Sequence, residues 1–142
     1  MRALFDVNML LALLDAAHVH HERAKNWLMS QADPSWASCP LTQNGFVRIL
    51  SQPSYPGHLS VHSAAKLLAE ATVSVHHEFW PDDLSLLDEA AFETTRIHGP
   101  GQLTDAYLLG LAAYRGGRLV ALDRSIAISG VPRAKSSNLV IL

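Results

Sequence analysis

Short apolar runs alternate with longer amphipathic segments along this chain. Five runs have the length and apolar character of strands in a sheet: residues 2–7, 36–39, 73–79, 118–122 and 139–142. The segments between them carry apolar residues at helical spacing or residues typical of helix starts. They predict helices over residues 9–14, 20–29, 60–71, 84–95 and 104–114. A further helix is predicted to be capped by Thr42 and to end near Leu50. Strands that alternate with helices predict an α/β fold with a mainly parallel central sheet.

Prolines and glycines mark the predicted boundaries. Pro40 ends the second strand, and Pro81 with the acids after it favours a helix that starts at Leu84. The Gly-Pro-Gly of residues 99–101 breaks the chain before the apolar helix, which Gly116 and Gly117 then stop. No repeat or low-complexity segment divides the sequence. We therefore predict one domain over residues 1–142.

Composition narrows the possible partners. The 142 residues are 49% hydrophobic, enough for a sizeable core, and the formal net charge of −2 provides no global attraction for nucleic acid. Residues 70–93 contain seven acids and no Lys or Arg, whereas residues 105–142 carry five basic side chains against two acids. This asymmetry fits either two ordinary solvated surfaces or a functional polarity, so any RNA contact must use a local patch.

The remaining composition favours a cytoplasmic protein. Cys39 is the only cysteine and cannot form an internal disulfide, which fits a reducing compartment. Asp6 and Asn8 interrupt the apolar start of the chain, no signal-cleavage pattern follows, and no apolar run reaches the roughly 20 residues of a membrane span.

Three aspartates border apolar segments that would meet at one edge of the sheet. Asp6 and Asp123 end the first and fourth predicted strands, and Asp105 lies in the first turn of the apolar helix. A helix-start role alone would also explain each aspartate, and Thr104 is the better cap for the last helix. If the three converge, however, their repulsion requires a cation, and oxygen ligands favour Mg²⁺ or Mn²⁺. Such a cluster can support phosphodiester hydrolysis.

These segments together resemble the PIN-domain ribonucleases, and among them the VapC-like toxins of bacterial toxin–antitoxin pairs. The similarity rests on ALFDVNMLLALLD, CPLTQNGFVRILSQP, QLTDAYLLGLAA and RLVALDRSI, in this order, and spans nearly the whole chain. It implies a three-layer α/β/α fold, RNA cleavage, a Mg²⁺ or Mn²⁺ cofactor, dimerisation and inhibition by a cognate antitoxin.

The resemblance also assigns roles to individual residues. Asp6, Asp105 and Asp123 would be the catalytic, metal-binding acids, and Asn8 and Thr104 would support the first and third motifs. Gln43 stands where family members usually carry a glutamate, and its uncharged amide is a poorer metal ligand. The missing carboxylate leaves open whether one or two ions bind.

Other residues receive lesser roles. Arg124, next to Asp123, is a better candidate than Arg48 for binding a phosphate, although an exposed arginine explains it equally well. The eight histidines, including His18 and His20, lack the spacing of a zinc site and are interpreted as surface or helix-start residues.

Two other functions stay open. One is a module that has lost catalysis through Gln43 and binds RNA or a protein. The other is a metal-dependent phosphatase, which is disfavoured because Asp6-Val7-Asn8 is not a D-x-D motif.

Overall fold

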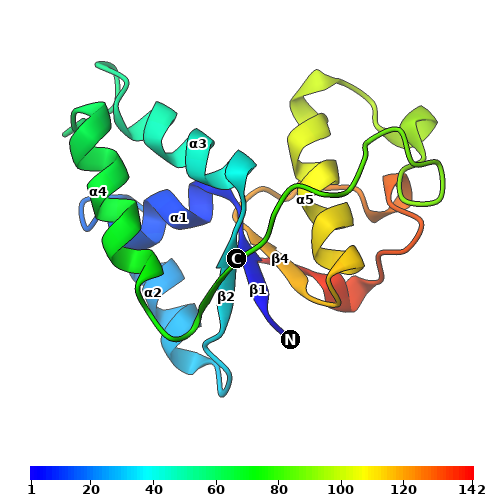
Figure 1. Cartoon of the computed structure of the whole chain (residues 1–142), viewed down its shortest axis with the longest axis horizontal. Coiled ribbons are helices and arrows are strands. Elements are labelled where there is room, and N and C mark those ends of the chain that lie inside the picture. Colours follow the sequence, from blue (N-terminus) through cyan, green and yellow to red (C-terminus); the bar gives the residue numbers. More distant parts are fainter.

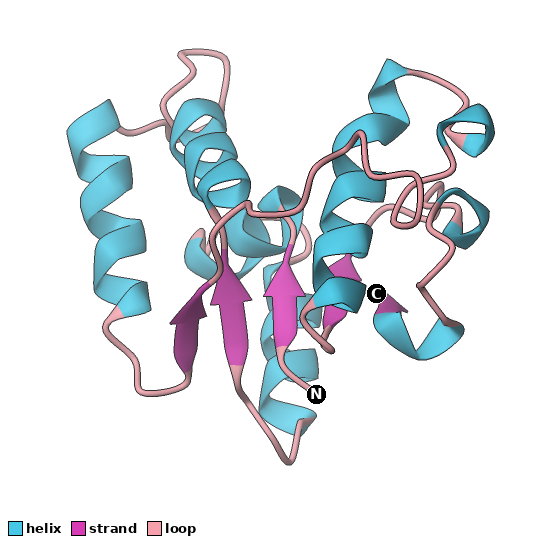
Figure 2. Cartoon of the chain, turned by 45° about the vertical axis from the view of Figure 1, so that its right-hand side comes forward, coloured by secondary structure: helices cyan, strands magenta, loops and turns pink.

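A five-stranded parallel sheet lies at the centre of the computed structural model, which describes all residues 1–142. The strands are β1 (Ala3–Phe5), β2 (Trp36–Ser38), β3 (His77–Phe79), β4 (Arg118–Ala121) and β5 (Leu139–Ile141). Their order is β3-β2-β1-β4-β5, and every neighbouring pair is parallel. All five carboxyl ends therefore lie at the same edge, as the arrows in Figure 2 show.

Helices cover both faces of this sheet, so the molecule has the predicted three layers (Figure 1). One face carries α1 (Val7–Leu14), α2 (His21–Ser30), α3 (Pro40–Leu50) and α4 (Val61–Thr72). The other carries α5 (Leu103–Tyr114) together with irregular segments that include the 3₁₀ turns Thr94–Arg96, Pro100–Gln102, Ile128–Gly130 and Ser136–Asn138. No helix has the length and apolar character that crossing a membrane requires.

Each face of the sheet has its own apolar core. Leu4 and Leu119 point to the α5 side, whereas their strand neighbours Phe5 and Val120 point to the α1–α4 side, because successive side chains of a strand alternate between faces. Trp36 and Trp80 are buried in these cores, so neither ring is free to stack on a base.

The helix predicted over residues 84–95 is wrong. This segment is a series of turns, in which the Ser85 hydroxyl accepts a hydrogen bond from the Leu87 N–H and the Asp88 carboxylate accepts one from the Ala90 N–H. Such local side-chain bonds compete with helical ones. The segment instead buries Phe92, whose ring stacks on Tyr107 of α5 at 5.8 Å between centroids.

Two predicted helix caps are also wrong. α3 begins at Pro40, so Cys39 is the cap residue, and the Thr42 hydroxyl reaches back to accept the Cys39 N–H at 3.0 Å. α5 follows directly on a 3₁₀ turn with Gln102 at the cap position, which leaves Thr104 inside the first turn. Gly116, at φ 67°, takes the left-handed conformation after α5 and ends it as predicted.

Candidate active site

The three predicted aspartates lie at the carboxyl edge of the sheet. Asp6 follows β1 directly and caps α1, where its Oδ1 accepts the Met9 N–H at 2.7 Å. Asp123 follows β4, the strand paired with β1. Asp105 is the third residue of α5, which packs against β4 and β1. Topology alone thus brings together residues that are about 100 positions apart.

Of the three aspartates, Asp6 has the most strongly shifted pKa. Its side chain is buried, with 3% of the residue exposed, and this burial raises its pKa to about 7. The bond from Met9 opposes that rise, whereas the negative charges of Asp105 and Asp123 add to it. At neutral pH Asp6 is therefore poised between its acid and its carboxylate.

Asp105 and Asp123 are in contrasting surroundings. Half-burial raises the pKa of Asp105, the Asp123 charge raises it further, and no hydrogen bond stabilises the Asp105 carboxylate. Asp123 is exposed, and the Ser125 N–H, donated at 2.8 Å, holds its pKa below the usual value. At neutral pH Asp123 is therefore negatively charged, and this charge raises the pKa of both Asp6 and Asp105.

These acids are neighbours without being a preassembled ligand shell. No three His, Cys, Asp or Glu side chains are arranged closely enough to hold a metal ion together. The donor set nevertheless suits a hard divalent cation, because all three groups offer carboxylate oxygens and Asp6 and Asp105 are destabilised as anions. A bound cation would relieve that repulsion.

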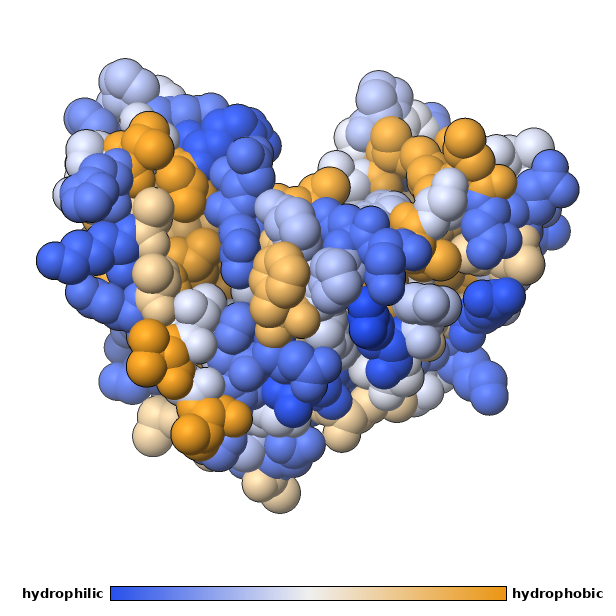
Figure 3. Space-filling view, in the orientation of Figure 1, coloured by the Kyte–Doolittle hydropathy of each residue, from blue (hydrophilic) through white to orange (hydrophobic).

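A groove between α3 and α5 is lined by Val7 and Thr104, the sequence neighbours of Asp6 and Asp105, and Figure 3 shows it as the notch at the top of the molecule. Its volume is about 420 Å³. Asn44 and Arg48 line it from α3, and Thr104 lines it from α5. Thr104 therefore sits on the wall next to Asp105, and Arg48 brings a positive charge that no carboxylate pairs.

Gln43 does not line this groove. Its amide donates a hydrogen bond to the Ser38 hydroxyl at 3.0 Å, and its side chain faces a hollow that it shares with Val47 and α4. The structure therefore places Gln43 on the opposite side of α3 from Asn44 and Arg48. The usual glutamate position, as aligned from the sequence, does not lie with the acids here.

The two other predicted site residues differ in placement. Asn8, in the first turn of α1, lines an open hollow together with Asp123. Arg124 is exposed beside Asp123 and forms no ion pair. Asn8 thus faces the site, whereas Arg124 stands at its rim.

Asp82 is a groove residue that the sequence did not reveal. It lines the groove after β3, where its Oδ2 accepts the Leu41 N–H at 3.1 Å and its buried Oδ1 has no partner. Its sequence position predicted only a helix start, because the contact with α3 spans 41 residues. For Asn44 and Arg48, the four-residue spacing from Pro40 was the available signal.

A family comparison fits this arrangement of fold and acids. The model of the PIN domain matches residues 3–129, which include all three aspartates. The chain belongs to the PIN-domain family. The match covers the sheet through β4 and both walls of the groove.

Within the PIN-domain family the chain is VapC-like. It is 54% identical to Ribonuclease VapC44 of Mycobacterium tuberculosis over 142 residues, which are 100% of both chains. It is also 39% identical to Ribonuclease VapC38 of the same organism, over 94% of each chain. These identities confirm the resemblance drawn from the four sequence motifs.

A solved structure shares this fold. The crystal structure of Mycobacterium tuberculosis VapC20, described as a sarcin–ricin-loop-cleaving toxin, superposes with a TM-score of 0.65 over 94% of this chain and 98% of that one. At 16% sequence identity, the similarity speaks for the shared architecture.

Proposed function

We propose that this PIN-domain protein is an endoribonuclease that requires Mg²⁺ or Mn²⁺. The observation that carries the proposal is the buried Asp6, whose pKa is raised to about 7 by burial and by the charges of Asp105 and Asp123. Three acids that repel one another at the edge of a groove form a site that a cation would complete. The relatives named ribonucleases support RNA as the substrate.

In this proposal the acids and the groove residues have separate roles. Asp6, Asp105 and Asp123 would hold the cation, which when bound would neutralise charge on the phosphate and lower the pKa of the attacking water. The Met9 N–H fixes the orientation of Asp6, so that this ligand needs no reordering. Arg48 and Asn44 would bind phosphate and sugar oxygens across the groove from Thr104.

The test is a single substitution. Asp105→Asn should reduce cleavage of total bacterial RNA by at least about a hundredfold while the circular dichroism spectrum stays native, because Asp105 forms no hydrogen bond that the fold needs. Glu89→Gln is the matched control, since Glu89 is exposed and lines neither the groove nor the hollow beside Asp123, and this variant should cut at the native rate. Full activity of Asp105→Asn would refute the proposal.

A cognate antitoxin is the proposed partner. The side chains between α1 and α2 leave an apolar groove of about 370 Å³, which Leu10, Leu13 and Leu28 line and Lys25 borders. An amphipathic helix with acidic flanking residues fits this surface, and a cation such as an arginine from the same chain could block the acids. When the two proteins are expressed together in the cytoplasm, they should copurify as a complex. A chain that is harmless when expressed and that copurifies with no other protein would count against this partner.

Homodimerisation is proposed as well. Val73 and Val75 are exposed between α4 and the edge strand β3, where Phe79 is also half-exposed. An apolar patch at a sheet edge is typical of a contact between subunits. Light scattering should give twice the mass of one 142-residue chain, and a monomer at micromolar concentration would contradict the proposal.

The second candidate function is a binding module of the same fold without catalysis. It relied on Gln43 as the missing acid, and the bond of Gln43 to Ser38 weakens that reasoning. A native protein that is inert with every divalent ion, combined with an active Gln43→Glu variant, would favour it.

A further inference from the structure

A histidine-bearing turn forms a second wall beside the acids. The turn between α1 and α2 carries His18, Val19 and His20, and these three residues line an open hollow of about 450 Å³ together with Asn8 and Asp123. The groove between α3 and α5 contains Val7, the residue before Asn8. The two hollows therefore lie on either side of the first turn of α1, which Asp6 caps.

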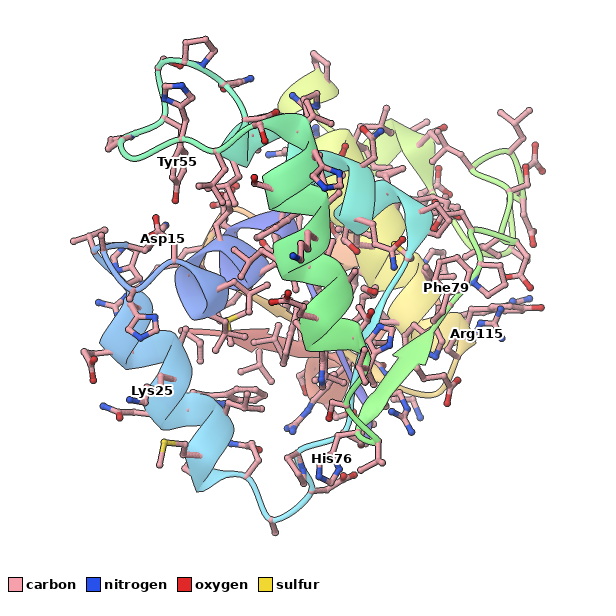
Figure 4. The ribbon with its side chains drawn as sticks, turned by 60° about the vertical axis from the view of Figure 1, so that its left-hand side comes forward. Asp15, Lys25, Tyr55, His76, Phe79 and Arg115 are labelled. Carbon is pink, nitrogen blue, oxygen red and sulfur yellow. The ribbon has the colours of Figure 1, made fainter.

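This turn is held in place from several directions. Asp15 accepts the Ala17 N–H at 3.0 Å with one oxygen and the Tyr55 hydroxyl at 2.7 Å with the other. Figure 4 shows Asp15 and Tyr55 pointing toward each other from the end of α1 and the loop after α3. At the far end of the turn, His21 bonds through Nδ1 to the Ala12 carbonyl at 2.8 Å. The turn is thus fixed before any substrate arrives.

The hydrogen bonding within the turn fixes the state of one imidazole. His18 Nδ1 accepts the His20 N–H at 3.0 Å, which places the ring proton on Nε2. Burial, followed by the charge of His20, lowers the pKa of His18 despite the opposing effect of Asp15. His18 is therefore a neutral ring with one free donor, next to a second ring 5.7 Å away and to the exposed Val19.

We propose that His18, Val19 and His20 form a subsite for one unpaired nucleotide of the RNA, adjacent to the scissile phosphate on the Asp123 side. The proposal rests on the ribonuclease function above and adds a position for the substrate. His18 Nε2–H donates to an acceptor on the base, while the His20 ring offers a flat face and Val19 an apolar side chain against which an unstacked base of RNA packs. Neutral donors suit this place because a cation would bind the acids instead.

The test uses two substitutions that separate the turn from the donor. In His18→Asn the side-chain oxygen replaces Nδ1 as acceptor for the His20 N–H and the Nε2 donor is lost, whereas His18→Gln keeps a donor near Nε2. His62→Asn on the exposed face of α4 is the matched control. Total bacterial RNA is the probe, and the most frequent cut, identified by sequencing the new 5′ ends, is followed over a range of RNA concentrations.

We expect His18→Asn to raise KM about fivefold, the effect of losing a hydrogen bond worth about 1 kcal/mol, with kcat within twofold and an unchanged melting temperature. His18→Gln should raise KM less, and His62→Asn should match the native protein. An active native enzyme combined with a native KM for His18→Asn overturns the subsite alone. A native protein that cuts no RNA overturns the ribonuclease proposal and the subsite with it.

Discussion

Asp6 should destabilise the metal-free fold at neutral pH. Replacing it by asparagine removes the buried charge and keeps an oxygen that can accept the Met9 N–H, so the cap on α1 survives. Asp6→Asn is therefore expected to be more stable than the native protein at pH 8 and equally stable at about pH 3.

The magnitude follows from the pKa. A folded-state pKa of about 7, against 3.8 for a free aspartate, means that the native state holds its proton where the unfolded chain has already lost it. The stability of the native protein therefore falls as pH rises from about 4 to about 7, and the linkage relation gives a total loss of about 4 kcal/mol. Well below pH 4 both states are protonated and the penalty vanishes, whereas well above pH 7 both are ionised and the penalty is constant.

Urea unfolding at a series of pH values with EDTA, followed by tryptophan fluorescence, measures this difference. Glu89→Gln is the control, because Glu89 is exposed and its charge is not among those that raise the pKa of Asp6, so this variant should show no stabilisation at pH 8. Saturating Mn²⁺ should narrow the gap between Asp6→Asn and the native protein by stabilising the latter. Equal stability of the two at pH 8 without metal would refute the assigned burial and repulsion.

Four further substitutions test the packing and the groove. Gln43→Glu should change the rate of cleavage of total RNA less than threefold, because the Gln43 side chain bonds to Ser38 and does not line the groove. A large gain in this rate would place residue 43 in the site. Arg48→Ala should raise KM for RNA about tenfold and weaken the dependence of KM on salt, because Arg48 lines the groove. Arg124→Ala should have a smaller effect on both. The reverse ranking would assign the phosphate contact to Arg124. Gly110→Ala should lower the free energy of unfolding by about 1–3 kcal/mol in urea, because the new methyl would clash with the ring of Phe92. Native stability would show that this ring can move.

Much of the fold could be predicted because local pattern and tertiary packing agree. Strands such as Arg118–Ala121 are short apolar runs that the two helical layers bury, and Gly116 ends α5 through the backbone conformation that it prefers. The prediction of a helix over residues 84–95 failed because the apolar residues of this segment are also compatible with turns. Contact with α5 decides between a helix and turns.

The placement of the acids was predictable in outline, and the groove was not. Asp6 and Asp123 follow strands, so a parallel sheet must bring them to one edge. The face of α3 that meets the groove is set by its packing against α1 and α4, which leaves Arg48 at the groove and Gln43 toward α4. Asp82 reaches α3 only through tertiary structure.

Cleavage of total bacterial RNA under metal exchange tests the central claim most directly. The native protein is stripped with EDTA, assayed, and assayed again after addition of Mg²⁺ or Mn²⁺. We predict no cleavage in EDTA and recovery with either ion, because Asp6, Asp105 and Asp123 need a cation to act together. Undiminished cleavage in EDTA would contradict the account.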